Sequence, residues 1–221
     1  MHLQIILGST RPERVIDRVG SWVESTARAH PGFDQVTLLD LRDWPLPMFA
    51  EGRGTIGDIA DPTYSDPLVK RWNQTLKQGD AFLIITPEYL HSVPGVLKNA
   101  LDSVFVSFAF RNKPATFVGY SVGHAAGARA VEHLAHIAIE SELVPLRNTV
   151  LIPKVDQAFD DQGRPLDPVT DVALGIALED LAWYAEALGA ARAKGQLPPA
   201  MARMMAAMHR PPAQAEADAQ D

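Results

Sequence analysis

One loop near the start of the chain combines the residue types that hold a phosphate. The apolar run Leu3–Leu7 ends at Gly8, and a helical pattern of apolar residues follows the loop Ser9-Thr10-Arg11-Pro12-Glu13-Arg14. Two hydroxyls, two guanidinium groups and the free N–H groups of a helix start are the parts of an anion site. Either arginine could instead be solvated at the helix start or pair with Glu13 and Asp17. The loop is neither a Walker A loop nor a dinucleotide fingerprint, so a mononucleotide phosphate is the candidate ligand.

A second stretch, Thr86–Asp102, sets a carboxylate, an aromatic ring and an imidazole between an apolar run and a helix. Glu88 could act as a general acid or base, but a carboxylate just before a helix is as often a dipole partner or a charge at a subunit contact, and we favour a structural role. Tyr89 could stack on a planar ring. His91 could donate a hydrogen bond to a ligand, although a lone loop histidine is more often solvated. No nucleophile, base and orienting group come together.

Apolar runs alternate with helical patterns along the chain. Five runs predict buried strands, at Leu3–Leu7, Val36–Leu41, Ala81–Thr86, Ala115–Tyr120 and Thr149–Ile152. Helices are expected between them, one capped by Ser65 or Asp66, and the last core helix is expected from Pro168 to about Ala191. The alternation predicts an α/β fold with a parallel, doubly wound sheet. In such sheets ligands lie beyond the carboxyl ends of the strands, where the loops after the first, third and fourth strands meet.

Three segments depart from this alternation. Residues 42–63 are expected to form a long loop that is either a lid or contact surface, or simply packs over the sheet edge. The apolar segment 103–110 is expected to continue the preceding helix, at a subunit contact. We expect one domain over residues 1–195 and a C-terminal extension over 196–221, made of a short Met-rich helix and a disordered tail.

Composition narrows the function classes. A formal net charge of -7 argues against nucleic acid as the main partner. The chain has no cysteine, which excludes disulfides, thiolate metal sites and cysteine nucleophiles, so redox chemistry would have to come from a bound cofactor. His133 and His136 lie three residues apart without an acidic ligand nearby, so no metal site is expected. No signal peptide or membrane span is expected, and we predict a cytoplasmic protein without a membrane partner.

Together the two stretches resemble the NADPH-dependent FMN reductase family, the flavodoxin-like quinone, azo dye and metal-oxyanion reductases. The specific parts are Gly8-Ser9-Thr10-Arg11-Pro12 with Arg14, and Pro87-Glu88-Tyr89 followed by His91-Ser92, Pro94-Gly95 and Leu97-Lys98-Asn99-Ala100-Leu101-Asp102. The resemblance implies a three-layer α/β/α fold with a five-stranded parallel sheet in the order 2-1-3-4-5. It also implies non-covalent FMN, NADPH or NADH as co-substrate, and a homodimer or a dimer-built homotetramer.

The resemblance implies roles for individual residues. It implies that the FMN phosphate is held by Ser9, Arg11, Arg14 and the N–H groups near Val15 and Ile16. Pro87, Glu88, Tyr89 and the Leu90 amide are implied along the isoalloxazine ring, with Ser121 and Gly123 at its pyrimidine side. His91 and His124 are candidates on the substrate side. No catalytic residue is expected, because the flavin carries the chemistry.

Three features depart from the family pattern. The position after Tyr89 is commonly Asn and is Leu90 here, which keeps the backbone donor and removes a polar side chain at the ring. The loop after the fourth strand is poorer in glycine, with Val122, His124, Ala125 and Ala126 in its place. The tail after Gly195 extends past the usual end.

The leading hypothesis is an FMN-dependent NAD(P)H oxidoreductase that passes hydride from nicotinamide to flavin N5. Electrons then go to a quinone or a similar small acceptor, with ping-pong kinetics. The alternative is a non-enzymatic FMN-binding electron carrier, or an interaction protein built on a degenerate flavin fold.

Overall fold

The computed structural model describes residues 1–57 and 62–209. The chain forms two compact units, Met1–Gly189 and Ala190–Asp221. The predicted domain boundary after residue 195 stays a prediction, and the predicted disordered tail falls mostly on 210–221, outside the described residues. The second unit contains helix α7 (Ala200–Met208), which carries the methionines.

The first unit is built on a parallel sheet with the predicted strand order. Its strands are β1 (His2–Leu7), β2 (Gln35–Asp40), β3 (Ala81–Pro87), β4 (Lys113–Tyr120), β5 (Leu143–Pro145) and β6 (Val150–Ile152). The order is β2-β1-β3-β4-β5, and β6 also pairs with β4. The predicted order 2-1-3-4-5 is therefore confirmed, with a sixth strand in addition.

The sheet has a sixth strand because two short strands, β5 and β6, pair with different parts of β4 at the edge of the sheet. Lys113–Ala115 of β4 pair with β5, whereas Val118–Tyr120 pair with β6. The predicted strand at Thr149–Ile152 corresponds to β6. The short strand β5 was not predicted, because three residues at the end of a helix show no periodicity of their own.

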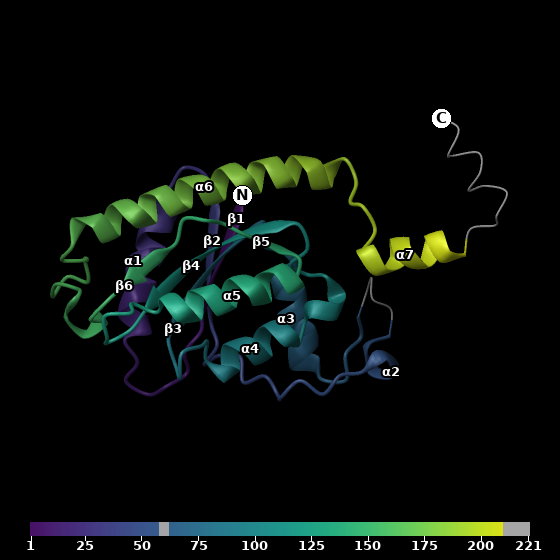
Figure 1. Ribbon diagram of the computed structural model, residues 1–221, viewed down its shortest axis with the longest axis horizontal. Helices are drawn as coiled ribbons and strands as arrows, with labels where there is room; N and C mark the ends of the chain where they lie inside the picture. Colours follow the sequence, from purple (N-terminus) through teal and green to yellow (C-terminus); the bar gives the residue numbers. More distant parts are fainter. Residues whose placement is uncertain (58–61, 210–221) are drawn as a thin grey trace. The chain divides into compact units, whose positions relative to one another are not determined.

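Helices cover both faces of the sheet, as Figure 1 shows. Helices α1 (Ile16–Ala29) and α6 (Pro168–Ala193) lie on one face, and α3 (Pro67–Lys77), α4 (Gly95–Asp102) and α5 (Ala128–Glu140) lie on the other. The alternation of side chains along β1 divides the core between them. Leu3, Ile5 and Leu7 pack with α1 and α6, whereas Ile6 packs with the opposite helices.

Two predicted helix starts are confirmed by their caps. The Asp66 carboxylate accepts a hydrogen bond from the Leu68 N–H at 2.7 Å, with Pro67 in the first turn of α3. The Asp167 carboxylate accepts one from the Val169 N–H at 2.9 Å, with Pro168 starting α6. These bonds satisfy N–H groups that a helix start leaves free.

The prediction that residues 103–110 continue a helix is wrong. Helix α4 ends at Asp102, and a short 3-10 turn, η1 (Phe105–Ser107), follows. Val104 and Phe110 are fully buried in the core formed with α3, α4 and α5. The segment is apolar because it folds back into the chain's own core. The expected loop 42–63 also holds a short helix, α2 (Arg53–Ile56).

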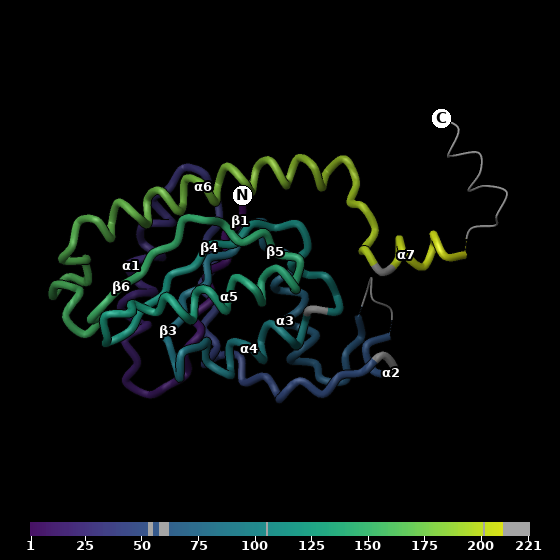
Figure 2. The backbone as a smooth tube through the Cα atoms, in the orientation of Figure 1, coloured from purple at the N-terminus to yellow at the C-terminus, as the bar shows by residue number. Residues whose placement is uncertain are grey.

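All strands point the same way, so their carboxyl ends lie at one edge of the sheet. The loops that leave β1, β3, β4 and β6 gather at this edge, at the left of Figure 2. The loops after β1, β3 and β4 are the three in which the sequence predicts the ligand site.

Gly8 lets β1 turn tightly against its neighbours. Its N–H donates to the Ile85 carbonyl at 2.9 Å. A Cβ at this position would come within 2.8 Å of a Leu97 methyl and 2.9 Å of the same carbonyl. No side chain fits there without moving β3 or α4.

We expect Gly8→Ala to lower the free energy of unfolding by about 1–3 kcal/mol, because the added methyl overpacks the end of β1. Gly175→Ala is the matched control, since Gly175 lies within α6 and a Cβ there would meet nothing within 4 Å. The control should gain up to about 1 kcal/mol from helix propensity. Urea denaturation of both variants checks the two signs, and equal stability of the two proteins would contradict the steric account.

Candidate active site

A cleft of about 370 Å³ lies at the carboxyl edge of the sheet, within the size range of small-molecule sites. Three loops and a residue after β6 form it. Its lining residues are Arg11, Pro12, Glu13, Arg14, Val15, Pro87, Glu88, Tyr89, Tyr120, Ser121, Val122 and Val155. The loops predicted to hold the phosphate and the ring thus share one cleft.

Arg14 is buried at the base of the first loop, with 2% of its side chain exposed. Its guanidinium group donates to the Asp17 carboxylate at 2.8 Å and to the Asp40 carboxylate at 2.8 Å, and also to the Ser9 carbonyl. Burial works against the charge, but these carboxylates raise the pKa of Arg14 above its ordinary value. The guanidinium group therefore fastens the loop to the end of β2, and it is already engaged within the chain.

The first and third loops touch each other directly. The Ser9 hydroxyl, which is fully buried, lies 2.8 Å from the Tyr89 hydroxyl. The Arg11 guanidinium group lies over the Tyr89 ring, 4.0 Å from its centre. Unlike Arg14, Arg11 is exposed, so its charge faces the cleft and solvent. Arg11 is thus the arginine available to an anion in the cleft.

Helix α1 begins without a side-chain cap, with Val15 at its N-cap. The Ile16 side chain is fully buried, so only the backbone of this residue can reach a ligand. The N–H groups of an uncapped first turn suit an anion such as phosphate.

A tight turn follows Tyr89 on the third loop. Tyr89 and Ser92 exchange two backbone hydrogen bonds, of 2.9 and 3.0 Å, and the two residues between them have positive φ, 49° at Leu90 and 63° at His91. Two positive φ angles are typical of a type I′ turn, in which Asn and Gly are favoured. The turn carries Leu90 on the surface beside the cleft.

Helix α5 braces the third loop. Arg129 forms an ion pair with the Glu88 carboxylate, whose side chain is buried, and a second guanidinium nitrogen lies 2.9 Å from His91 Nε2. Since a guanidinium group only donates, the His91 nitrogen accepts in this contact. His133 Nδ1 lies 2.9 Å from the Ser92 hydroxyl. Glu88 and His91 thus have structural partners.

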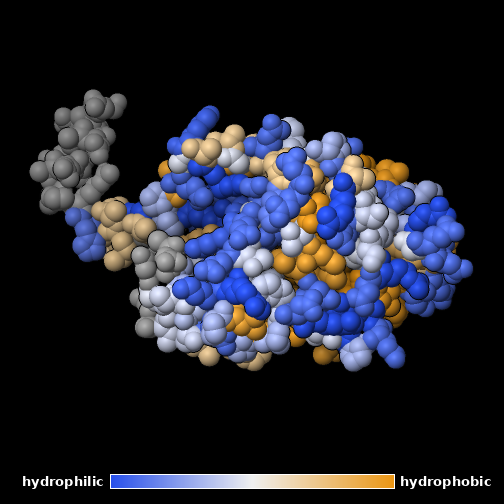
Figure 3. All heavy atoms as spheres, turned by 180° about the vertical axis from the view of Figure 1, so that it is seen from behind, coloured by the Kyte–Doolittle hydropathy of each residue, from blue (hydrophilic) through white to orange (hydrophobic). Residues whose placement is uncertain are grey.

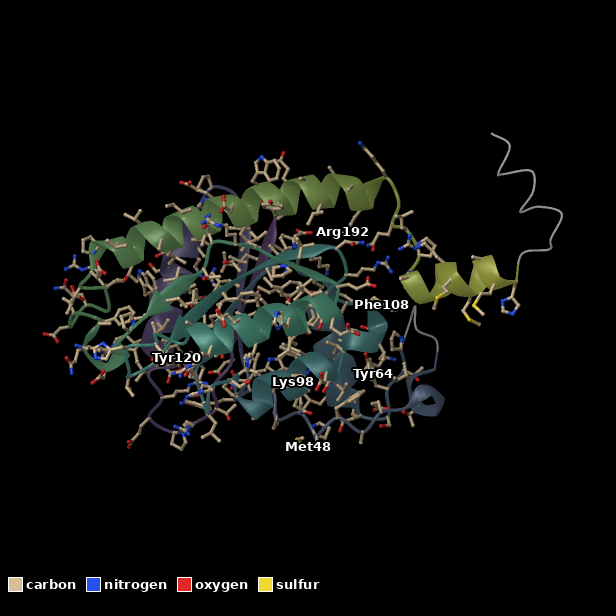
Figure 4. The ribbon with its side chains drawn as sticks, viewed as in Figure 1. Met48, Tyr64, Lys98, Phe108, Tyr120 and Arg192 are labelled. Carbon is tan, nitrogen blue, oxygen red and sulfur yellow. The ribbon has the colours of Figure 1, made fainter. Side chains whose placement is uncertain are left out.

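The fourth loop contributes Ser121 and Val122 to the lining of the cleft. Ser121 donates its N–H to the Ile152 carbonyl at 3.2 Å and its hydroxyl to the Gly123 carbonyl at 3.1 Å. His124 is exposed on the same loop. Gly127 ends the loop with φ 82°, and a Cβ there would come within 2.5 Å of the Tyr120 nitrogen. Tyr120 lies at the end of β4 (Figure 4), and burial raises its pKa well above the usual range, so its hydroxyl stays protonated.

A second groove of about 350 Å³ borders the first loop at Thr10. It is lined by Thr10, Leu41, Arg42, Trp44, Pro45, Leu46, Met48, Val96 and Asn99. The Asn99 amide clamps its wall, donating to the Pro47 carbonyl at 2.9 Å and accepting from the Phe49 N–H at 2.8 Å. The segment after β2 is therefore packed against α4.

Over residues 1–57 and 62–209, no group of three or more His, Cys, Asp and Glu side chains could hold a metal ion. Within the same residues, no helix has both the length and the apolar character needed to cross a membrane.

Residues 1–157 match the family model described as NADPH-dependent FMN reductase. This chain belongs to that family. An NAD(P)H-dependent FMN reductase of Schizosaccharomyces pombe is 31% identical over 152 residues, which cover 68% of this chain and 72% of the relative. A quinone reductase of Escherichia coli is 40% identical over 124 residues, 55% of this chain and 64% of the relative.

Solved structures show the same fold. The flavoenzyme FerB, an NAD(P)H:(acceptor) oxidoreductase from Paracoccus denitrificans, superposes with a TM-score of 0.65 at 21% identity, over 84% of this chain and 97% of that protein. The flavodoxin-like fold expected of an FMN reductase is therefore confirmed.

Several of the residues predicted at the site line the cleft, together with residues that were not predicted. Arg11, Arg14, Val15, Pro87, Glu88, Tyr89 and Ser121 line it, whereas Ser9, Ile16, Leu90, His91, Gly123 and His124 do not. Tyr120, Val122, Val155 and the bracing residue Arg129 were not predicted. Tyr120 ends a predicted strand at the site edge, a signal that could have found it. Arg129 carries no such signal, because its contact depends on how α5 packs.

We expect Asp40→Asn to destabilise the protein, because it removes one of the two carboxylates that pair with the buried Arg14 guanidinium group. The loss should be about 2 kcal/mol, below the ~3–5 kcal/mol of a fully buried pair, since 21% of the Asp40 side chain is exposed. Burial opposes the Asp40 charge, but Arg14 and the Arg42 N–H hold the pKa of this carboxyl below its usual range. The stabilisation by the ionised Asp40 carboxylate is therefore fully present above about pH 3.9, the pKa of aspartate in an unfolded chain. It is lost as the pH falls through the lower pKa that this carboxyl has in the folded protein.

Urea denaturation at pH 7 and at pH 4 and below measures this effect. The difference between wild type and Asp40→Asn should shrink in acid. Asp43→Asn, an exposed carboxylate three residues further along the chain, is the matched control and should stay within about 0.5 kcal/mol. A difference that does not change with pH would contradict the ion-pair account.

Proposed function

We propose that this FMN reductase family member uses NADPH or NADH to reduce a quinone or a similar small acceptor through FMN bound in the cleft at the carboxyl edge of the sheet. One observation carries the proposal: an exposed guanidinium group, Arg11, and an aromatic ring, Tyr89, meet in this cleft, on loops leaving adjacent strands. A cationic group beside a planar ring matches a ligand with a phosphate at one end and a flat ring system at the other.

The residues present fit FMN. Arg11 and the uncapped start of α1 would hold the phosphate. Pro87, Glu88 and Tyr89 would lie along the isoalloxazine, with Ser121 and Gly123 on its pyrimidine side. Arg14 and Ser9 would act mainly by shaping the loop, because Arg14 is paired with two carboxylates and the Ser9 hydroxyl is buried against Tyr89.

When bound, FMN supplies the capacity to accept hydride from a nicotinamide and to pass electrons on to an acceptor. The chain's part is to bind, orient and exclude water. Tyr120 stays protonated in its buried position and can only donate or accept a hydrogen bond there. Because one cleft would serve NAD(P)H and the acceptor in turn, we expect ping-pong kinetics.

We further propose that the protein acts in the cytoplasm as a homodimer or a dimer-built homotetramer. Exposed hydrophobic side chains support a self-contact, and on the face drawn in Figure 3 they gather in a patch bordered by hydrophilic ones. Light scattering coupled to size exclusion tests the assembly, and a monomer at micromolar concentration would refute it.

Purified protein should be yellow or become so with FMN, and its flavin absorbance should bleach when NADPH or NADH is added without oxygen. Reoxidation by added 1,4-benzoquinone completes the test. Bound flavin that stays oxidised with both nucleotides would support a carrier instead, and failure to bind FMN would refute both functions.

Arg11→Ala should weaken FMN binding about tenfold or more, because it removes a charge-assisted contact to the phosphate. Fluorescence quenching on titration with FMN measures the Kd. Riboflavin, which lacks the phosphate, is the matched ligand, and its Kd should change much less. Equal losses for FMN and riboflavin would place Arg11 at the ring and not at the phosphate. Arg18→Ala, on the exposed surface of α1, is the control variant.

A further inference from the structure

Leu90 occupies a position that is unfavourable for its residue type. Its backbone has φ 49°, in the left-handed region, and its side chain is fully exposed, at 101% of the reference area. A left-handed conformation strains any residue with a branched apolar side chain, and Asn or Gly would relieve the strain. Packing of the Leu90 side chain does not offset this cost, because the residue is fully exposed.

The turn that carries Leu90 is nevertheless held firmly. The Tyr89–Ser92 hydrogen bonds close it. Arg129 of α5 also forms an ion pair with Glu88 and a hydrogen bond with His91. The backbone of Leu90 is therefore held at a defined place beside the cleft. Strain that persists in a well-supported segment beside a binding cleft points to a role in function.

A second exposed apolar side chain stands on the neighbouring loop. Val122 lines the cleft and is 72% exposed. Its loop leaves β4 next to the third loop, because Pro87 at the end of β3 pairs with Tyr120 at the end of β4. Leu90 and Val122 thus rise from adjacent strand ends on the same edge of the sheet, and together we name them the apolar rim.

We propose that the apolar rim selects acceptors with hydrocarbon substituents, and that Leu90 is its specificity-determining residue. Leu90 would cover an alkyl group of the acceptor, so that its exposed area is buried only in the acceptor complex. The occupant is a small apolar-substituted ring compound, since the rim borders a cleft of small-molecule size. This inference rests on the proposed function and specifies its acceptor class.

Leu90→Asn and Leu90→Gly test the proposal, with Leu166→Asn as the matched control. Leu166 is another exposed leucine, at 63%, and it lies after β6 with no positive φ. The first readout is the Tm of FMN-free protein. Both Leu90 variants should raise it by about 2–4 °C, the shift expected for relieved backbone strain in a chain of this size. A lower Tm in both would mean that Leu90 packs within the chain, which would overturn the proposal.

The second readout compares two acceptors, 2-tert-butyl-1,4-benzoquinone and 1,4-benzoquinone. The quantity compared is kcat/KM for the alkylated quinone divided by kcat/KM for 1,4-benzoquinone. This ratio should be the same in Leu166→Asn as in wild type. In Leu90→Asn and Leu90→Gly the ratio should be about tenfold lower than in wild type, because the buried alkyl contact is lost. A ratio within twofold of wild type in both variants would overturn the proposal.

The failures of the two proposals are distinguishable. Wild-type protein that does not bind FMN, or whose flavin is not bleached by NADPH or NADH, refutes the proposed function. Wild-type protein that reduces both quinones, with a ratio that the Leu90 variants leave unchanged, refutes only the role of the apolar rim.

Discussion

The site depends on the buried charge of Arg14. A guanidinium group out of water requires carboxylate partners, and it takes them from the end of β2 and the first turn of α1. These contacts fix the path of the loop between β1 and α1. Since that loop carries both Arg11 and the start of α1, its fixed path sets where an anion can be bound.

The second constraint is the contact between the first and third loops. Ser9 and Arg11 both meet Tyr89, although about eighty residues separate them in sequence. Parallel pairing of β1 with β3 makes this contact possible, because it brings the two strand ends to one edge. The third loop is in turn held by Arg129, so the cleft is supported from both layers of helices.

Much of this arrangement could be predicted from the sequence, because buried parallel strands are continuous apolar runs and helix starts carry recognisable caps. The loops at the site follow from strand direction alone, and the family resemblance adds strand order and cofactor. Pairing of Arg14 with Asp17 was one of the alternatives that the sequence offered, but its second carboxylate partner, Asp40, and the partner of Glu88, Arg129, could not be predicted. Both come from residues distant in the chain, and a charged side chain in a sequence does not reveal whether it faces a ligand or another side chain. The prediction for the apolar segment 103–110 was wrong for a related reason. An apolar sequence does not reveal whether it is buried at a subunit contact or, as here, in the core of its own chain.

Because β5 and β6 are separate short strands at one edge of the sheet, this edge resists aggregation at high protein concentration. An uninterrupted edge strand exposes a row of unpaired N–H and C=O groups onto which another chain can add a strand. Here that edge consists of β5 and β6, each three residues long, with a break between them at residues 146–149. Neither piece is long enough to template a stable intermolecular pairing, so this side of the molecule is protected against edge-to-edge aggregation by its geometry.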